Sequence, residues 1–342
     1  MPAQPVRDSL CEPLTEPLRF RLRVPATSAN LGPGYDSMGL ALGLYDVVDV
    51  IASPRAHAER AQITVRVQGQ GAGELPQDAS HLVVSLIEEI LSSKGYALPD
   101  LQVTAHNSIP HSRGLGSSAA AAATAVVTAS QLLPEGLSPQ EQLQIGSRIE
   151  GHPDNYVPAL RGGLALSWQS GAPERARFRS VPLTPHPRLR LMLAVPNVEQ
   201  STHTARTLIP ARISHADAAC NSARTGLLVH ALTAQPSLLL EATEDRLHQE
   251  YRRSAFPASM ELVDALRAAD HAAVISGAGP SVLVLADGDT AAEAALELVV
   301  SRGSEPGEAV GFDEPAGTRE PIFGPKILPL SPSGATVEEY PR

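Results

Sequence analysis

A short segment of the chain combines glycine, serine and alanine in the pattern of an anion-binding loop. Glycine lets the backbone approach a bulky group and adopt positive φ. The alanine run after Ser118 has high helix propensity and little bulk, so it predicts a closely packed helix. The first amides of such a helix are unpaired, and its N-terminus attracts phosphate. The predicted phosphate site comprises Pro110, His111, Ser112, Arg113, Gly114, Leu115, Gly116, Ser117, Ser118, Ala119 and Ala120.

Three common glycine-rich motifs do not fit this segment. A Walker A loop ends in Gly-Lys-Ser or Gly-Lys-Thr, and this segment has no lysine. The glycine spacing of dinucleotide-binding loops is absent, and Ala120 stands where a hydrolase elbow needs glycine. A tight turn before a packed helix would have the same composition. For this segment alone, that alternative stays open.

Two further segments concentrate polar side chains. Residues 26–36 follow a predicted strand and are rich in hydrogen-bonding groups, among them Asn30 and Asp36. The segment Glu150–Asn155 ends a predicted helix and holds two carboxylates, an imidazole and an amide. Carboxylates beside a phosphate site indicate Mg²⁺, which prefers oxygen ligands. Taken alone, each segment could equally be a surface turn, with His152 a buried histidine whose hydrogen bonds are satisfied.

Hydrophobic periodicity predicts the elements that position these segments. Apolar residues alternate with arginines over 18–24, which predicts a strand with one wet face that ends at Pro25. Ser138 and Glu141 form a capping box for a helix that runs to Glu150. Further strands are predicted over 40–51, 61–67, 101–106, 162–168, 189–195, 272–275 and 281–285, and helical structure over 78–94, 204–267 and 290–302.

Composition limits the classes of partner. The net charge of −10 argues against a surface for nucleic acid or anionic membranes, which would need a basic field. Cys11 and Cys220 lie far apart and show no metal-ligand spacing. No stretch approaches the roughly 20 continuous apolar residues of a membrane span, and residues 1–17 lack the pattern of a signal peptide. We therefore expect a soluble, cytoplasmic protein with neither a nucleic acid nor a membrane as partner.

Together and in this order, the segments resemble the GHMP kinases, a family named after galactokinase, homoserine kinase, mevalonate kinase and phosphomevalonate kinase. Residues 25–36, Pro-Ala-Thr-Ser-Ala-Asn-Leu-Gly-Pro-Gly-Tyr-Asp, are very close to the homoserine kinase form, which usually has Phe in place of Tyr35. Residues 114–120 match the shared ATP loop, and Gly-Ala-Gly-Pro-Ser at 277–281 matches the third family motif. The resemblance covers about residues 18–300.

The resemblance implies an α+β fold with the two-domain GHMP kinase architecture. The N-terminal domain would be like domain 2 of ribosomal protein S5, and the C-terminal domain would be ferredoxin-like. A cluster of prolines near 170–188 suggests the boundary between the two domains. The expected organisation is a flexible lead-in over 1–17, an ATP-binding domain over 18–185, a C-terminal domain over 186–302 and a Pro- and Gly-rich segment over 303–342 without assigned elements.

The resemblance also implies roles for individual residues. The phosphates of ATP would lie on the loop 110–120, with Mg²⁺ held by Ser118 and Glu150. Glu250 stands where the family usually has proline, which leaves the geometry before Arg252 open. The implied substrate-binding residues are Asn30, Asp36, His152, Thr204, Arg206 and Arg252.

The charges of these residues suit an amino acid substrate. Homoserine is a zwitterion with a terminal hydroxyl, so its ammonium would meet Asp36 and its carboxylate Arg206 or Arg252. The implied activity is ATP-dependent phosphorylation of that hydroxyl to O-phospho-L-homoserine, a step of threonine biosynthesis, by a homodimer. Asp154 is a weak candidate for a general base. The alternatives are a GHMP kinase for mevalonate or a sugar, and a non-catalytic ligand sensor on the same fold.

Overall fold

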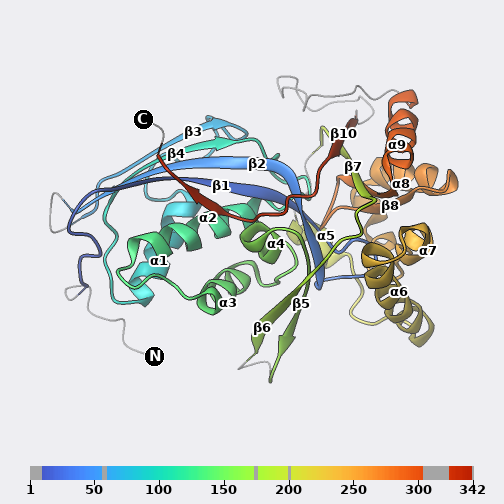
Figure 1. Ribbon diagram of the computed structural model, residues 1–342, viewed down its shortest axis with the longest axis horizontal. Coiled ribbons are helices and arrows are strands. Elements are labelled where there is room, and N and C mark those ends of the chain that lie inside the picture. The colour runs from blue at the N-terminus through green and yellow to red at the C-terminus, as the bar shows by residue number, and fades with distance from the viewer. Residues whose placement is uncertain (1–9, 56–59, 173–175, 199–201, 303–322, 341–342) are drawn as a thin grey trace.

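The computed structural model describes residues 10–55, 60–172, 176–198, 202–302 and 323–340, with only the backbone of 202–204. The chain forms two β-sheets, each with helices packed on it, which confirms the predicted α+β class (Figure 1). A long sheet and four helices make up the N-terminal part. A smaller, four-stranded sheet and the remaining helices make up the C-terminal part.

The long sheet has the order β11-β1-β2-β4-β3, and β5 pairs with both β2 and β6. All its pairs are antiparallel except β3 with β4. In Figure 1, β5 and β6 extend from the body as a two-stranded ribbon. The strands are β1 (Leu18–Ala29), β2 (Met38–Ser53), β3 (Ile63–Gly69), β4 (Asp100–Asn107), β5 (Leu164–Ser170), β6 (Arg177–Leu183) and β11 (Thr336–Glu338).

Strand β1 shows the predicted alternation but not the predicted end. Phe20, Leu22 and Val24 are buried while the arginines between them reach solvent. The prediction that the strand ends at Pro25 is wrong, because the register only shifts between Pro25 and Ala26 and pairing continues to Ala29. Such an irregularity accommodates a residue without an N–H donor. The extension matters because it carries the polar loop deep into the molecule.

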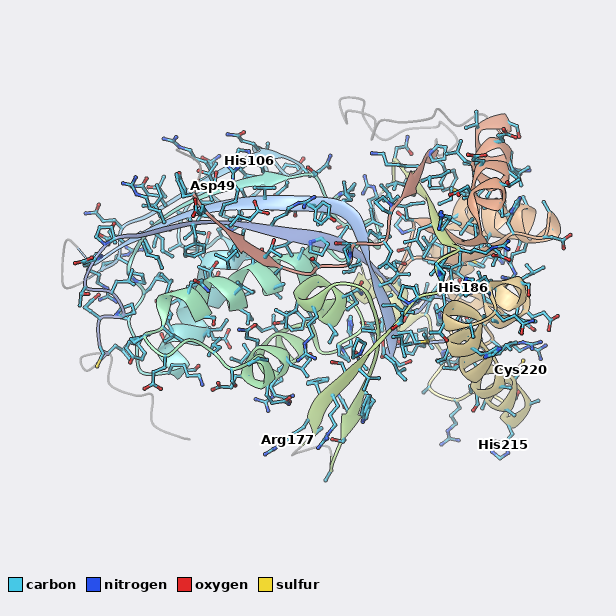
Figure 2. All side chains as sticks on the ribbon, viewed as in Figure 1. Asp49, His106, Arg177, His186, His215 and Cys220 are labelled. Carbon is cyan, nitrogen blue, oxygen red and sulfur yellow. The ribbon has the colours of Figure 1, made fainter. Side chains whose placement is uncertain are left out.

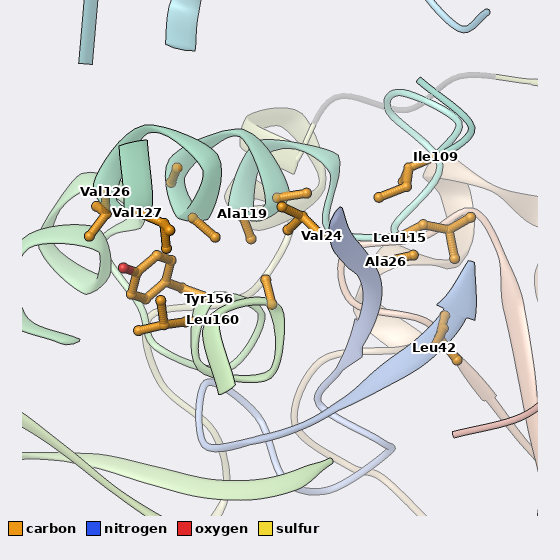
Figure 3. Packing of buried hydrophobic residues seen from close by; sticks show 14 of the residues in the cluster. Val24, Ala26, Leu42, Ile109, Leu115, Ala119, Val126, Val127, Tyr156 and Leu160 are labelled. Atoms are coloured by element: carbon orange, nitrogen blue, oxygen red, sulfur yellow. The ribbon is translucent and has the colours of Figure 1, made fainter. Parts of the chain in front are cut away.

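Four helices cover one face of the long sheet (Figure 1). The predicted alanine-rich helix is confirmed as α2, which begins at Ser117, and most of its small side chains are buried. The predicted capping box of Ser138 and Glu141 is confirmed, and α3 ends at Glu150. Figure 3 shows Val126 and Val127 of α2 close to Tyr156 within this core. The helices are α1 (Leu82–Ser93), α2 (Ser117–Leu132), α3 (Pro139–Glu150) and α4 (Tyr156–Arg161).

The second sheet has the order β10-β7-β9-β8 and is antiparallel throughout. Its strands are β7 (Leu189–Pro196), β8 (Ala272–Ile275), β9 (Val282–Asp287) and β10 (Phe323–Leu328). The helices of this part are α5 (Thr202–Thr207), α6 (His215–Thr233), α7 (Leu239–Ala242), α8 (Pro257–Ala268) and α9 (Asp289–Ser301), with 3₁₀ turns η3 (Pro236–Leu238) and η4 (Glu250–Ala255).

Two regions without a predicted element contain strands. Residues 177–183, which lie in the proline-crowded boundary, form β6 along the full length of β5. In the tail, β10 pairs with β7 and β11 pairs with β1, so the final segment adds one strand to each sheet. In the described part of the chain, no helix is long and apolar enough to cross a membrane.

Candidate active site

The predicted phosphate loop lies between the two halves of the molecule. Gly114 has φ +71°, and a Cβ there would lie 2.2 Å from the backbone oxygen of Ser276. The Ser276 hydroxyl is 2.7 Å from the Gly114 carbonyl and 2.8 Å from the Ser28 hydroxyl. The turn before β9, the phosphate loop and β1 therefore touch at one point. The structure thus brings together the three motifs that the sequence analysis singled out.

Gly116 is the N-cap of α2 and adopts the left-handed conformation, with φ +66°. A Cβ at this position would lie 1.9 Å from Oγ1 of Thr27. That hydroxyl donates to Oδ1 of Asn155 over 2.9 Å, so the start of α2 packs directly on both polar segments. Only glycine permits this approach, and it leaves the first amides of α2 facing the loop.

Ser118 and Glu150, the predicted Mg²⁺ ligands, lie side by side. The Ser118 hydroxyl donates to a carboxylate oxygen of Glu150 over 3.0 Å, from the first turn of α2 to the end of α3. Burial raises the pKa of Glu150 above its usual value, although the Ser118 hydrogen bond opposes this. Two oxygen donors beside a helix N-terminus fit a magnesium ion bound to phosphate, and a cation would offset the desolvation of the carboxylate.

Asp36 and Arg206 form an ion pair across 170 residues of sequence. The two guanidinium nitrogens donate to the two carboxylate oxygens over 3.0 and 2.8 Å, which is the bidentate geometry. The pair is accessible, with 35% of the Asp36 side chain and 40% of the Arg206 side chain exposed. The hydrogen bonds to Asp36 raise the pKa of Arg206. Both residues are substrate ligands predicted from the sequence, which does not indicate that they contact each other.

Asn30 braces the loop that carries Asp36. Its side-chain nitrogen donates to the Gly277 carbonyl over 2.8 Å, and its side-chain oxygen accepts from the Asp36 amide over 3.0 Å. Both Asn30 and Asp36 have positive φ, 68° and 54°, a conformation that asparagine and aspartate tolerate better than most residues. The amide thus holds Asp36 in place against the C-terminal part.

Arg252 is buried, with 1% of its surface exposed. Its Nε donates to the Ala205 carbonyl over 3.1 Å, and one terminal nitrogen lies 3.2 Å from Nδ1 of His248. Among the described residues, no carboxylate lies within ion-pair distance of this guanidinium. Burial lowers the pKa of Arg252, although the charges of Asp36 and Asp245 oppose this. A buried cation without an anion partner is costly, so this position favours an anionic ligand.

Two aromatic residues that were not predicted from the sequence, Tyr35 and His248, lie beside these arginines. The rings of Tyr35 and His248 lie 5.2 Å apart, centre to centre. The guanidinium carbons of Arg206 and Arg252 lie 5.5 and 5.6 Å from the centre of the Tyr35 ring. The position of His248 four residues before Arg252 was the available sequence signal, but only the fold shows that the two side chains are in contact.

His152 and Asp154 form a second charged group beside Asp36. Nδ1 of His152 is hydrogen-bonded to the Asp154 carboxylate, which also accepts from the Asn155 amide over 2.8 Å. Burial acts to lower the pKa of His152, but the hydrogen bond and charge of Asp154 outweigh it, and the net shift is upward. One ligand atom each from Asp36, His152 and Asp154 lie within 4.8 Å of one another. Two predicted substrate residues, Asp36 and His152, therefore lie close to each other and to the candidate base Asp154.

Arg113 of the phosphate loop is a buried residue. Its buried guanidinium donates to the carbonyls of Pro196 and Asn197 over 3.0 and 3.3 Å, and to that of His111 over 3.2 Å. The side chain thus connects the phosphate loop to the end of β7. The sequence predicts that Arg113 belongs to the ATP-binding loop but does not indicate this contact. The side chain of Thr204, another predicted substrate residue, lies outside the described residues.

Comparison with known proteins agrees with the geometry. The sequence model of the family "GHMP kinases N terminal domain" matches residues 81–163. That of the family "GHMP kinases C terminal" matches residues 227–304. A homoserine kinase of Mycobacterium sp. (strain KMS) is 45% identical over 286 residues, covering 82% of this chain and 88% of that protein. The homoserine kinase of Mycolicibacterium smegmatis is 46% identical over 289 residues, covering 82% and 89%.

Solved structures support the same fold. A homoserine kinase from Cytophaga hutchinsonii superposes with a TM-score of 0.75 at 23% identity, over 93% of this chain and 97% of that one. A putative homoserine kinase from Listeria monocytogenes superposes with a TM-score of 0.68 at 26% identity, over 94% and 100%. By sequence, by fold and by the arrangement of its three motifs, the chain belongs to the GHMP kinase family, among the homoserine kinases.

Proposed function

We propose that this protein is an ATP-dependent homoserine kinase that converts the side-chain hydroxyl of L-homoserine to O-phospho-L-homoserine. The curated relatives of similar length carry that name, at 45% and 46% identity. The observation that carries the proposal is the placement of Asp36, Arg206 and Arg252 around one ring, Tyr35. This arrangement offers one anion and two cations to a substrate that bears one charge of each sign.

Binding of homoserine would redistribute these charges. Its ammonium would take the Asp36 carboxylate as partner, and its carboxylate would lie between the guanidinium groups of Arg206 and Arg252. Arg252, buried without a carboxylate among the described residues, would then gain one. Planar guanidinium forks match a carboxylate in two hydrogen bonds each, which fixes the orientation as well as the affinity. The hydroxyl end of the substrate would extend toward the phosphate loop.

The phosphates of ATP would lie at the start of α2. Backbone amides there, together with the hydroxyls of Ser117 and Ser118, would surround the γ-phosphoryl group and stabilise its charge. Ser118 and Glu150 would hold Mg²⁺, which neutralises negative charge on the phosphates when it is bound. Held in line, the substrate oxygen forms a bond to the γ-phosphorus while the bond to the β-phosphate oxygen breaks, releasing ADP and the hydroxyl proton.

We assign no general base to this transfer. Asp154 is the candidate, because it lies beside Asp36 in the same cluster of side chains. Its carboxylate already accepts hydrogen bonds from His152 and from the Asn155 amide. Transfer to a phosphoryl group depends mainly on alignment and charge neutralisation, so a strong base is not required.

The family resemblance supports three further parts of the proposal. We infer a homodimer, a cytoplasmic location and a division of the chain into an ATP-binding domain over 18–185 and a C-terminal domain over 186–302. Sedimentation analysis of the purified protein tests the first, since a monomer at micromolar concentration would contradict it. Limited proteolysis near residue 185 tests the third.

A substrate panel in an ADP-release assay tests the proposed activity. The expected outcome is turnover of homoserine, with mevalonate, galactose and shikimate at least about 100-fold slower, because each of these lacks the ammonium that pairs with Asp36. Turnover of mevalonate or galactose instead would favour another GHMP kinase activity. Release of no ADP with any of the four would favour a ligand sensor.

A further inference from the structure

His248 is a fully buried imidazole whose two nitrogens face different parts of the candidate site. Its Nε2 lies 2.8 Å from the Gly32 carbonyl, in the loop that carries Asp36. Its Nδ1 lies 3.2 Å from a terminal nitrogen of Arg252, four residues later in the chain. His248 therefore connects the loop that holds the anionic side of the site with the arginine on its cationic side.

The chemistry of the two neighbours selects one protonation form of this ring. A carbonyl oxygen only accepts, so Nε2 must carry the hydrogen that it donates to Gly32. A guanidinium only donates, so Nδ1 must present its lone pair to Arg252. Neutral imidazole with the hydrogen on Nε2 satisfies both contacts, whereas imidazolium would direct a second N–H at a cation. Burial lowers the pKa of His248, which keeps the ring neutral at physiological pH.

The surroundings of His248 hold the ring rigidly. The Asp245 carboxylate accepts from the amides of Leu247, His248 and Gln249 over 3.1, 3.0 and 2.8 Å, which fixes the backbone. This carboxylate is itself buried and lies 3.8 Å from Nε2. The ring also packs on that of Tyr35, with 5.2 Å between the ring centres. The other charges near the ring are those of Arg252 and Asp36.

The Gly32 carbonyl reaches the histidine because the loop lies unusually close to this segment. Gly32 has φ +87°, and a Cβ there would lie 2.6 Å from the backbone oxygen of Thr243. A larger residue would push the loop away from the chain that leads to His248. The close approach makes Gly32, His248 and Arg252 a single hydrogen-bonded unit, with Asp36 four residues beyond Gly32.

We propose that His248 is a positioning residue that, through one neutral tautomer, aims the Arg252 guanidinium at the substrate carboxylate and fixes its distance from Asp36. This inference rests on the proposed function, in which Arg252 receives the carboxylate. A buried histidine can also serve packing alone. The two roles differ in what they predict, because packing affects all substrates alike whereas positioning of Arg252 affects only a ligand with a carboxylate.

Two substitutions separate the two hydrogen bonds of the ring. His248→Gln places an amide near the position of Nε2 and can still donate to Gly32, but it offers Arg252 no acceptor near Nδ1. His248→Asn places an amide oxygen near the position of Nδ1 and can still accept from Arg252. We expect His248→Gln to raise the KM for homoserine about tenfold or more, with the KM for ATP changed less than about twofold. His248→Asn should recover most of that loss.

A substrate without the carboxylate supplies the control for folding. In 3-aminopropan-1-ol a hydrogen replaces the carboxylate of homoserine, so its binding should be equal in wild type and His248→Gln. It is measured as a substrate, or as a competitive inhibitor where turnover is too slow. His215→Gln, at the exposed start of α6, is the matched surface variant and should change nothing (Figure 2).

The outcomes are distinct. Equal losses for homoserine and 3-aminopropan-1-ol in His248→Gln would overturn the positioning role, as would an unchanged KM for homoserine. Equal losses in His248→Asn and His248→Gln would overturn the role of Nδ1 as acceptor. If the wild-type protein does not turn over homoserine, the proposed function itself fails, and that result precedes any variant.

Discussion

The Asp36–Arg206 ion pair sets the charge balance that a ligand meets. Both side chains are about one-third exposed, so solvent screens the pair and its net contribution to stability is small, about 0–1 kcal/mol. Breaking this ion pair costs little free energy if the ligand supplies a new partner of opposite charge to each of the two side chains. A zwitterion does so, since its ammonium pairs with Asp36 and its carboxylate with Arg206. A ligand with only a carboxylate would leave Asp36 unpaired beside Asp154, which disfavours mevalonate.

Removal of Arg206 should affect the amino acid substrate selectively. Arg206→Ala deletes one carboxylate ligand and leaves Asp36 without its guanidinium, so we expect the KM for homoserine to rise about 10- to 100-fold. The KM for ATP should change much less, because the contacts of Arg206 lie with Asp36 and Tyr35. Steady-state kinetics with each substrate varied in turn gives both constants.

Arg190→Ala is the matched control for this variant. Arg190 also forms a bidentate pair with an aspartate, Asp289, but this exposed pair joins β7 to the start of α9. Both Michaelis constants should be unchanged in that variant. A change in Arg206→Ala that is confined to the KM for ATP would remove Arg206 from the substrate site.

The identities of the charged residues in the site were predictable, but their partners were not. Asp36, Arg206 and Arg252 follow from residue type within recognisable motifs. The contact between Asp36 and Arg206 spans 170 residues, and that between His248 and Gly32 spans 216. Arg113 is a further example, since its place in the loop does not indicate that its buried guanidinium donates to the end of β7. Local patterns contain no information about such long-range contacts.

At the scale of elements, the phosphate loop is anchored where it leaves β4. Asp46 of β2 accepts from the amides of Ser108 and Ile109 over 2.7 and 2.9 Å, directly before Pro110. The carboxyl is 8% exposed, and its desolvation outweighs these hydrogen bonds and raises its pKa to about 6. The backbone that leads into the phosphate loop is thus held by a buried carboxyl that titrates near neutral pH.

Asp46 should make stability depend on pH in a definite direction. Its pKa in the folded protein, about 6, exceeds the ordinary aspartate pKa of about 4, so the folded state binds the proton more tightly. The contribution of Asp46 to the free energy of unfolding is therefore fully present below about pH 4. It is lost as the pH rises to about 6, which lowers the free energy of unfolding by an amount on the order of 2–3 kcal/mol. Asp46→Asn removes this titration while keeping an oxygen acceptor for the two amides.

Urea unfolding at pH 4.5 and pH 7 isolates this contribution. Other groups titrate in the same interval, so the comparison is between wild type and variant. Wild type should lose more stability than Asp46→Asn between the two values, and the variant should be at least as stable at pH 7. The same pH dependence in both proteins would mean that Asp46 has an ordinary pKa.

At the scale of the whole molecule, the candidate site exists only because two halves meet. Asn30 donates to Gly277, Arg113 donates to Pro196, and Ser276 contacts Gly114, each contact joining an N-terminal segment to a C-terminal one. The last strands join the halves again, since β10 completes the small sheet and β11 the long one.

The sequence predicted most of the strands in both sheets, but not β6 and not the strands of the tail. β10 contains Gly324 and Pro325, and β11 has three residues, so neither shows the apolar alternation by which strands are recognised. Their pairing depends on edges that earlier strands present. By contrast, α3 was predicted closely because its capping box and terminal glycine are local signals.

The contact between the halves can be tested at a single glycine. Gly114→Ala introduces a methyl group 2.2 Å from the Ser276 carbonyl and 2.8 Å from that of Gly279, in a residue with φ +71°. The methyl group must push the phosphate loop and the turn at 276–279 apart. We expect the KM for ATP to rise about tenfold or more and kcat to fall, because transfer requires close alignment of the reacting atoms.

Gly136→Ala separates this effect from backbone strain. Gly136 also has positive φ, +66°, but its nearest neighbour to an added Cβ is a Ser130 oxygen at an ordinary 3.5 Å. Both variants carry the cost of alanine in a left-handed conformation, about 1 kcal/mol of unfolding free energy. Only Gly114→Ala separates the two halves, so only it should alter the kinetic constants. Equal kinetic effects would show that the fit between phosphate loop and turn does not determine how ATP is held.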